Sequence, residues 1–229
     1  MNPVTQLTHR YTRAVDMARL LHGAEIRKGT TIPYLAHLLS VSALVLEHGG
    51  TEDQAIAALL HDAAEDHGGQ ARVDAIRAEF GNNVADIVAA CSDSLIEDRS
   101  KKAPWWERKV AYLVQIEGEP PEALLVTAAD KLHNARAILN DYRNVGDELW
   151  CRFNSDAGRP GALWYYTRLA EILGARLTEG DGQKLAAELD RTVQAICQLA
   201  AGNRHDHVEE INEGRAREAS IRADRARRS

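Results

Sequence analysis

The stretch "ALLHDAAEDHGG", residues 58–69, runs from apolar residues directly into a group of titratable side chains. The apolar residues before it recur at intervals of three and four residues, which is the spacing of a buried helix. Residues four apart share a helix face, so His61 lies beside Glu65 and Asp62 lies beside Asp66. Buried carboxylates without a compensating charge cost roughly several kcal/mol each. The stretch therefore predicts a core helix that ends at a site in need of a cation.

The rest of the chain shows the same helical spacing, and no segment alternates convincingly with period two. We expect an all-α bundle of about eight to ten helices. Thr51 and Gln54 form a predicted capping box at the start of the central helix. The expected helices span residues 8–27, 34–47, 51–66, 71–80, 83–92, 105–115, 121–142, 162–177 and 182–201. Residues 1–201 are expected to form one domain, and the charged tail 202–229 is expected to be a solvated helix or disordered.

The composition of the chain excludes several classes of function. The chain has 229 residues, 45% of them hydrophobic, and a formal net charge of −6. An acidic chain of this kind argues against binding to a nucleic-acid polymer or to a membrane surface. Cys91, Cys151 and Cys197 are widely spaced, and no apolar run approaches the roughly 20 residues that span a bilayer. We expect a cytoplasmic protein with reduced thiols, and its oligomeric state is left open.

Two further polar residues stand on otherwise apolar helices. His37 lies in "IPYLAHLLSVSALV" and Asp130 lies in "ALLVTAADKLHNARAIL". Either residue alone could be a satisfied core or capping side chain. Together with His61 and Asp62 they predict a mixed imidazole and carboxylate site for one divalent cation. That donor set suits Mn, Fe, Zn or Co rather than a metal that prefers thiolates.

The ordered segments "RKGTTIPYLAH", "ALLHDAAED" and "AADKLHNAR" resemble the HD superfamily of metal-dependent phosphohydrolases. Within it they are most similar to the (p)ppGpp hydrolase domain of RelA/SpoT-type enzymes and to the small alarmone hydrolases. The resemblance covers roughly residues 14–177 and implies an HD-domain helical bundle over residues 1–201. It implies Mn²⁺, or another divalent ion, bound by the four residues His37, His61, Asp62 and Asp130. Glu65 and Asp66 match the motif that orients or activates the attacking water.

The resemblance also implies contacts to the nucleotide. Asn134 matches a position near the nucleotide, and Arg27 and Lys28 match a basic pair that contacts phosphate or base. Two residues depart from the family pattern: Leu38 stands where the family usually has proline, and Ala137 stands where it often has threonine.

Further cations are needed if the substrate carries a pyrophosphate group. Arg108 and Lys109 follow a pair of tryptophans at a loop-to-helix junction and are candidates, although both could be ordinary surface charges. Tyr166, in a late aromatic cluster, is a candidate to line the pocket against a base or ribose. Its alternative is a place in the core.

Three hypotheses about function remain open on the sequence. The leading one is a Mn²⁺-dependent hydrolase that removes the 3′-pyrophosphate of (p)ppGpp. The second is a phosphohydrolase of the same architecture that acts on another nucleotide, such as an adenosine alarmone, a nucleoside phosphate or NADPH. The third is a sensor that binds a nucleotide without turning it over.

Overall fold

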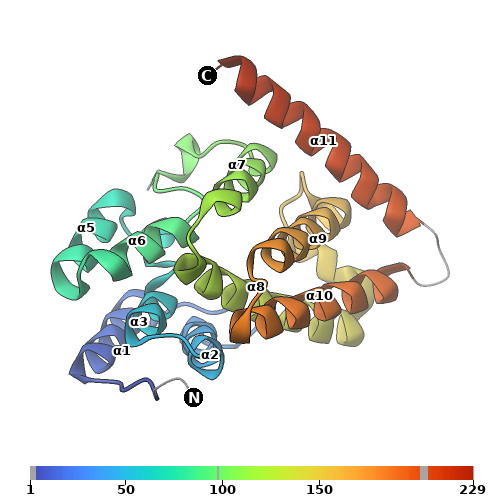
Figure 1. The fold of residues 1–229 in the computed structure, drawn as a ribbon. Helices are drawn as coiled ribbons and strands as arrows, with labels where there is room; N and C mark the ends of the chain where they lie inside the picture. The colour runs from blue at the N-terminus through green and yellow to red at the C-terminus, as the bar shows by residue number, and fades with distance from the viewer. Residues whose placement is uncertain (1–3, 97, 202–205, 229) are drawn as a thin grey trace.

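The computed structural model describes residues 4–96, 98–201 and 206–228. Their regular structure is helical, with turns and loops between the helices, and an isolated bridge between Ile26 and Pro33 is the β pairing found among them. The all-α expectation is confirmed (Figure 1). The helices are α1 (His9–His22), α2 (Tyr34–Glu47), α3 (Glu52–Leu60), α4 (Ala63–Asp66), α5 (Gly69–Phe80), α6 (Asn82–Cys91), η1 (Arg99–Lys101), α7 (Trp105–Gly118), α8 (Pro121–Val145), η2 (Gly146–Arg152), α9 (Gly158–Arg176), α10 (Gly180–Ala201) and α11 (Asp206–Arg228).

Helix α3 forms the centre of the N-terminal half. Its residues 55–60 are fully buried, and it packs against α1, α2, α6 and α8. The predicted capping box is present, because the Thr51 side chain accepts from the backbone N–H of Gln54 and the Gln54 side chain accepts from the backbone N–H of Thr51. Helix α8 is buried along residues 123–130. Both central helices are rich in alanine, whose small side chain lets neighbouring backbones approach closely.

The expected continuous helix to Asp66 is wrong at one point. Helix α3 ends at Leu60, and α4 begins at Ala63. His61 and Asp62 both keep right-handed helical backbone angles, although those of Asp62, φ −91° and ψ −8°, depart from the values of a regular helix. The titratable cluster therefore starts in a turn between two helices.

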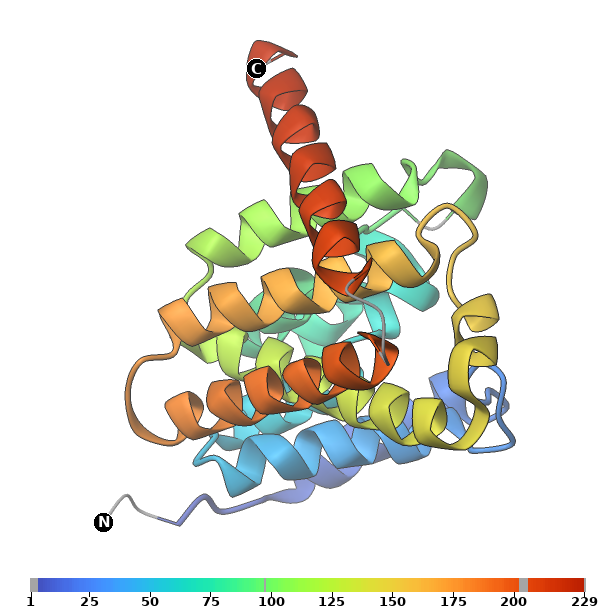
Figure 2. The same ribbon diagram turned by 90° about the vertical axis from the view of Figure 1, so that its right-hand side faces the viewer.

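The C-terminal tail has one packed face. Helix α11 crosses α9 and reaches towards α7 (Figures 1 and 2). The buried carboxylate of Glu218 accepts from Trp164 Nε1 at 3.2 Å and from Arg168 Nε at 2.9 Å. Gly214 lies directly against the indole of Trp164. The described part of the tail is thus a helix held on the bundle, while residues 202–205 and 229 lie outside the described residues.

None of the described helices is long and apolar enough to cross a membrane.

Candidate metal centre

The structure brings four polar side chains together beside the end of α3: His37, His61, Asp62 and Asp130. His37 comes from α2 and Asp130 from α8. The Nε2 atom of His61 lies 3.0 Å from Asp62 Oδ2 and 3.5 Å from Asp130 Oδ1. The Nε2 atom of His37 lies 3.8 Å and 3.3 Å from the same two oxygens. All four side chains therefore direct a nitrogen or oxygen atom into one small volume.

The ring of His61 has a buried nitrogen atom that faces this volume. Its Nδ1 atom donates to the Ala58 carbonyl at 2.8 Å, so Nε2 carries the lone pair of the neutral ring. That Nε2 atom is buried and finds no hydrogen-bond partner among the described residues. Burial lowers the pKa of His61, but the facing carboxylates of Asp62 and Asp130 outweigh it and hold the pKa well above its usual value, so without an ion they favour a proton on Nε2 that a bound cation would displace. A divalent cation fits here, because it satisfies the lone pair and both carboxylates at once.

Three neighbouring donors fix the two carboxylates. The phenol of Tyr34 donates to Asp62 Oδ2 at 2.5 Å. Lys131 Nζ donates to Asp130 Oδ2 at 2.6 Å, and Asn134 Nδ2 donates to Asp130 Oδ1 at 2.5 Å. Burial and the charge of Asp62 raise the pKa of Tyr34, so the phenol stays protonated and remains a donor. The carboxylates are held in place by bonds of the kind that orient metal ligands.

His133 orients His37 from outside the centre. Burial, followed by the charges of His37 and Arg27, lowers the pKa of His133 to about 4, so this ring is neutral at pH 7. Arg27 Nη1 lies 3.3 Å from His133 Nδ1 and can only donate. His133 Nδ1 is therefore an acceptor, and His37 Nδ1, at 2.8 Å, donates to it. This leaves the lone pair of His37 on Nε2, which faces the two carboxylates.

Glu65 and Asp66 lie on the short helix α4. Glu65 Oε2 accepts from the backbone N–H of Asp93 at 3.4 Å, and Oε1 lies 3.8 Å from Lys102 Nζ. Burial, and then the charge of Asp93, raise the pKa of Glu65 to about 7. The carboxylate of Glu65 can thus exchange a proton near neutral pH. Asp66 ends the helix, and its charge contributes to the raised pKa of Tyr34.

Arg108 and Lys109 are bound to a buried carboxylate that the sequence analysis did not single out. Arg108 Nη1 lies 2.5 Å from both oxygens of Asp93, and Lys109 Nζ lies 2.6 Å from Oδ2. Lys109 also sits over the ring of Tyr165 at 5.0 Å. Two cations share one carboxylate, so one positive charge remains in excess beside Glu65, whose Oε1 is 4.0 Å from Arg108.

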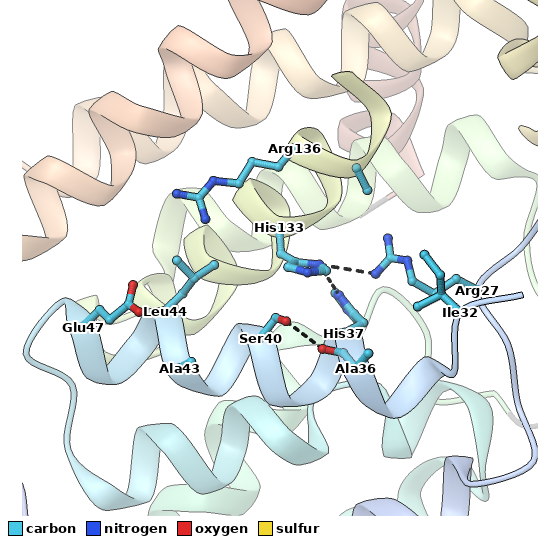
Figure 3. A pocket seen from close by; sticks show the side chains of 11 residues that line it. Arg27, Ile32, Ala36, His37, Ser40, Ala43, Leu44, Glu47, His133 and Arg136 are labelled. Atoms are coloured by element: carbon cyan, nitrogen blue, oxygen red, sulfur yellow. Dashed lines mark hydrogen bonds between the residues drawn. The ribbon is translucent and has the colours of Figure 1, made fainter. Parts of the chain in front are cut away.

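Two adjoining cavities flank the centre. The smaller, of about 250 Å³, is lined by all four of the remaining predicted contacts: Arg27, Lys28, Asn134 and Tyr166. The larger, of about 540 Å³, is lined by His37, His133 and Arg136. Figure 3 shows the side chains of Arg27 and His37 both directed towards His133. Arg27 lines both cavities and thus lies at their junction.

The model of the HD domain family matches residues 14–150. The chain belongs to the HD domain family. Over 130 residues it is 34% identical to human guanosine-3′,5′-bis(diphosphate) 3′-pyrophosphohydrolase MESH1, a match that covers 55% of this chain and 67% of the human protein. It is 32% identical over 127 residues to the guanosine-3′,5′-bis(diphosphate) 3′-pyrophosphohydrolase of Aquifex aeolicus, with 55% of this chain and 17% of that protein covered.

The chain therefore spans less than a fifth of the much longer Aquifex relative. Among solved structures, lmo0812 from Listeria monocytogenes EGD-e matches with a TM-score of 0.61 and 29% identity, covering 70% of this chain and 97% of that chain. A metazoan ortholog of SpoT that hydrolyzes ppGpp matches with the same TM-score and 21% identity, covering 85% and 97% of the two chains. At that identity the second likeness shows the fold alone.

Three residues of this HD domain were missed by the sequence analysis: Tyr34, Asp93 and Lys131. Lys131 has a recognisable signal, because it is a cation directly after Asp130 on an apolar helix. Asp93 follows the buried end of α6, which also marks it as a carboxylate near the core. Tyr34 has no such signal, since an aromatic residue at the start of an apolar helix is ordinary core sequence.

Proposed function

We propose that this HD domain is a Mn²⁺-dependent hydrolase that removes the 3′-pyrophosphate of (p)ppGpp. The observation that carries the proposal is the convergence of two imidazoles and two carboxylates around the unpartnered Nε2 atom of His61 in the described residues. The names of the human and Aquifex relatives supply the substrate.

We assign the ion to His37, His61, Asp62 and Asp130. When bound, a divalent ion supplies activation of water and polarisation of a phosphoryl oxygen. Both histidines turn Nε2 towards the two carboxylates, and both carboxylates are held by neighbouring donors, so little reorganisation is needed to receive it.

Glu65 is the proposed proton acceptor. Its pKa of about 7 matches the operating pH, which is where a general base works best. It lies one helical turn after Asp62, and the excess cationic charge of Arg108 and Lys109 beside it supports its ionised form. Asp66 is assigned the task of orienting the attacking water.

Arg27 is the proposed principal phosphate contact. Its two hydrogen bonds, to Asn134 Oδ1 at 2.8 Å and to His133 Nδ1, go to uncharged groups. The positive charge of Arg27 is therefore not neutralised by these partners and is available to a phosphate. Lys28 is exposed at the same cavity, where Tyr166 is assigned a contact to base or ribose.

A different nucleotide is the second candidate substrate. Ala137 lines both cavities, at the position where the resemblance leads us to expect threonine. Alanine lacks the threonine hydroxyl, so the wall between the two cavities has one hydrogen-bonding group fewer. This favours a nucleotide that differs from (p)ppGpp in the part that contacts this wall.

The decisive experiment is to incubate the purified full chain and Mn²⁺ with ppGpp and a panel of other nucleotides, with products separated by anion-exchange chromatography. We expect GDP and pyrophosphate, and loss of both with chelator and in Asp62→Ala. Asp16→Asn is the matched control, since Asp16 is exposed on α1 and outside the centre. Turnover of another nucleotide in place of ppGpp would support the second candidate. Metal binding without turnover of any nucleotide would refute the hydrolase proposal.

The cytoplasm is the proposed location. Cys91, Cys151 and Cys197 are all unpaired, which is usual in a reducing compartment. The proposed partner is the nucleotide substrate, and the oligomeric state stays open.

A further inference from the structure

A second group of histidines and a carboxylate lies on the far side of Tyr34. It consists of His22, the last residue of α1, Glu25 in the following turn, and His67, which caps α4. His22 Nδ1 lies 2.8 Å from Glu25 Oε2, and His67 Nε2 lies 2.9 Å from Glu25 Oε1. One donor atom from each of the three residues falls within 4.8 Å of the others.

One histidine of this group, His67, shares a feature with His61: its unpartnered Nε2 atom faces a carboxylate. His22 is only 1% exposed, and its Nε2 atom is buried. His67 Nε2 is also buried, and it makes no hydrogen bond although Glu25 Oε1 lies 2.9 Å away. Within residues 4–96, 98–201 and 206–228, neither Nε2 atom has a hydrogen-bond partner. An ion bound by His22 Nδ1, Glu25 and His67 Nε2 would supply the partner that His67 Nε2 lacks, and so would recover the free energy that an unpartnered buried imidazole nitrogen costs.

The backbone holds the three residues in this arrangement before any ion arrives. Glu25 N donates to the His22 carbonyl at 3.0 Å, and Tyr34 N donates to the Glu25 carbonyl at 2.9 Å. His67 N donates to the Ala63 carbonyl at 3.0 Å. The group is thus built on a fixed frame that joins two segments far apart in the chain.

We propose that His22, Glu25 and His67 form a second divalent-cation site, suited to Zn²⁺. Two imidazoles and a carboxylate are a common protein donor set for zinc, with a fourth position taken by water. Zn–N and Zn–O bonds of about 2.0–2.1 Å in a tetrahedron place donor atoms about 3.3 Å apart. The observed separations of 2.8 and 2.9 Å need to widen by only a few tenths of an ångström to match.

The site ties the end of α1 to the residue that directly follows Asp66. The ring of Tyr34 stacks on His22 with centroids 5.3 Å apart, while its hydroxyl bonds Asp62. The second ion therefore sits behind the candidate metal centre and fixes the turn that carries the Glu65 and Asp66 pair. Its role is to position that turn, and it touches neither the water nor the nucleotide.

The test is a zinc titration of the metal-free full chain, with bound metal counted by elemental analysis after gel filtration. We expect two equivalents for the wild type and one for Glu25→Gln, an isosteric change that keeps a hydrogen-bonding group beside His22. Asp130→Asn should also bind one equivalent, and the double variant none. His9→Gln is the matched control, because His9 is an exposed histidine on the same helix, and it should keep two.

The counts separate this proposal from the proposed function. A wild type that binds one equivalent, lost in Asp130→Asn, would overturn the second site and leave the first intact. Two equivalents in Glu25→Gln would also overturn it. Circular dichroism of Glu25→Gln checks that the variant folds, and His67→Gln supplies an independent change at the same site, for which one equivalent is again expected.

Discussion

Asp130→Asn tests whether the four converging side chains hold an ion. In the metal-free protein this carboxylate is paired with Lys131 and bonded by Asn134, and it faces the Nε2 atoms of His37 and His61. Removing its charge leaves the buried Lys131 ammonium without its carboxylate, which costs about 3–5 kcal/mol of unfolding free energy. That cost is present without any metal, so absolute stability cannot reveal the ion. The informative quantity is the gain in stability that Mn²⁺ produces.

The size of this gain follows from linkage. An ion that binds only the folded state at 100 times its dissociation constant adds about 2.7 kcal/mol, which raises Tm by about 5–11 °C for a chain of this size. We expect Asp130→Asn to lose about that much of the Mn²⁺-dependent gain in thermal unfolding. Asp141→Asn, on the same helix but paired with Arg152 away from the centre, should keep it. An undiminished gain in Asp130→Asn would refute the assignment of Asp130 as a ligand.

Three other outcomes follow from the structure. Glu65→Gln is expected to lower turnover by about 10²–10⁴-fold, the range of general acid–base catalysis, with unchanged Mn²⁺ affinity; wild-type turnover would exclude Glu65 as the base. Burial raises the pKa of Asp93, but its two cationic neighbours outweigh it and lower the pKa to about 2. This lowered pKa contributes about 2 kcal/mol to the free energy of unfolding, which is complete above the unfolded pKa near 4 and is lost as the pH falls towards 2. Urea unfolding at a series of pH values should show that loss in the wild type and not in Asp93→Asn. The same dependence of the unfolding free energy on pH in both proteins would contradict this. Gly214→Ala should lower Tm because the added Cβ would meet the Trp164 side chain. Gly174→Ala has open space around it and should raise the free energy of unfolding by up to about 1 kcal/mol. An equal rise in stability in both variants would show that α11 does not pack as described.

Local signals in the sequence predicted the bounds of α2 and the start of α3, whereas the first helix, expected over residues 8–27, ends at His22, directly before Gly23. Helix α2 begins and ends at the predicted residues because Pro33 precedes it and two glycines follow it. The start of α3 is set by its capping box. These signals act through neighbouring residues alone, so they can be read without knowledge of the fold.

The break after Leu60 could not be read this way. Residues 55–66 contain neither glycine nor proline, and their pattern is that of one continuous helix. The hydrogen bonds at the break are made by side chains, one of them from another helix. Tyr34 of α2 donates to Asp62, and the His61 ring donates to the Ala58 carbonyl. Adjacent residues on a continuous helix point about 100° apart. His61 Nε2 and Asp62 Oδ2 nevertheless lie 3.0 Å apart at the turn after Leu60, so the part of the helix that the sequence failed to predict lies at the centre.

The distribution of charge explains how an acidic chain could accept a polyanion. Of the cations around the two cavities, Arg136 is paired with Glu188 and Arg152 with Asp141, so each is largely neutralised. Arg27 instead bonds a neutral imidazole and an amide. Its charge is held in a fixed position at the junction of the cavities without being cancelled by those partners, which is the condition for strong recognition of a phosphate. The net charge of −6 therefore does not oppose binding of a phosphorylated nucleotide, because recognition depends on the few cations whose charge the fold leaves available.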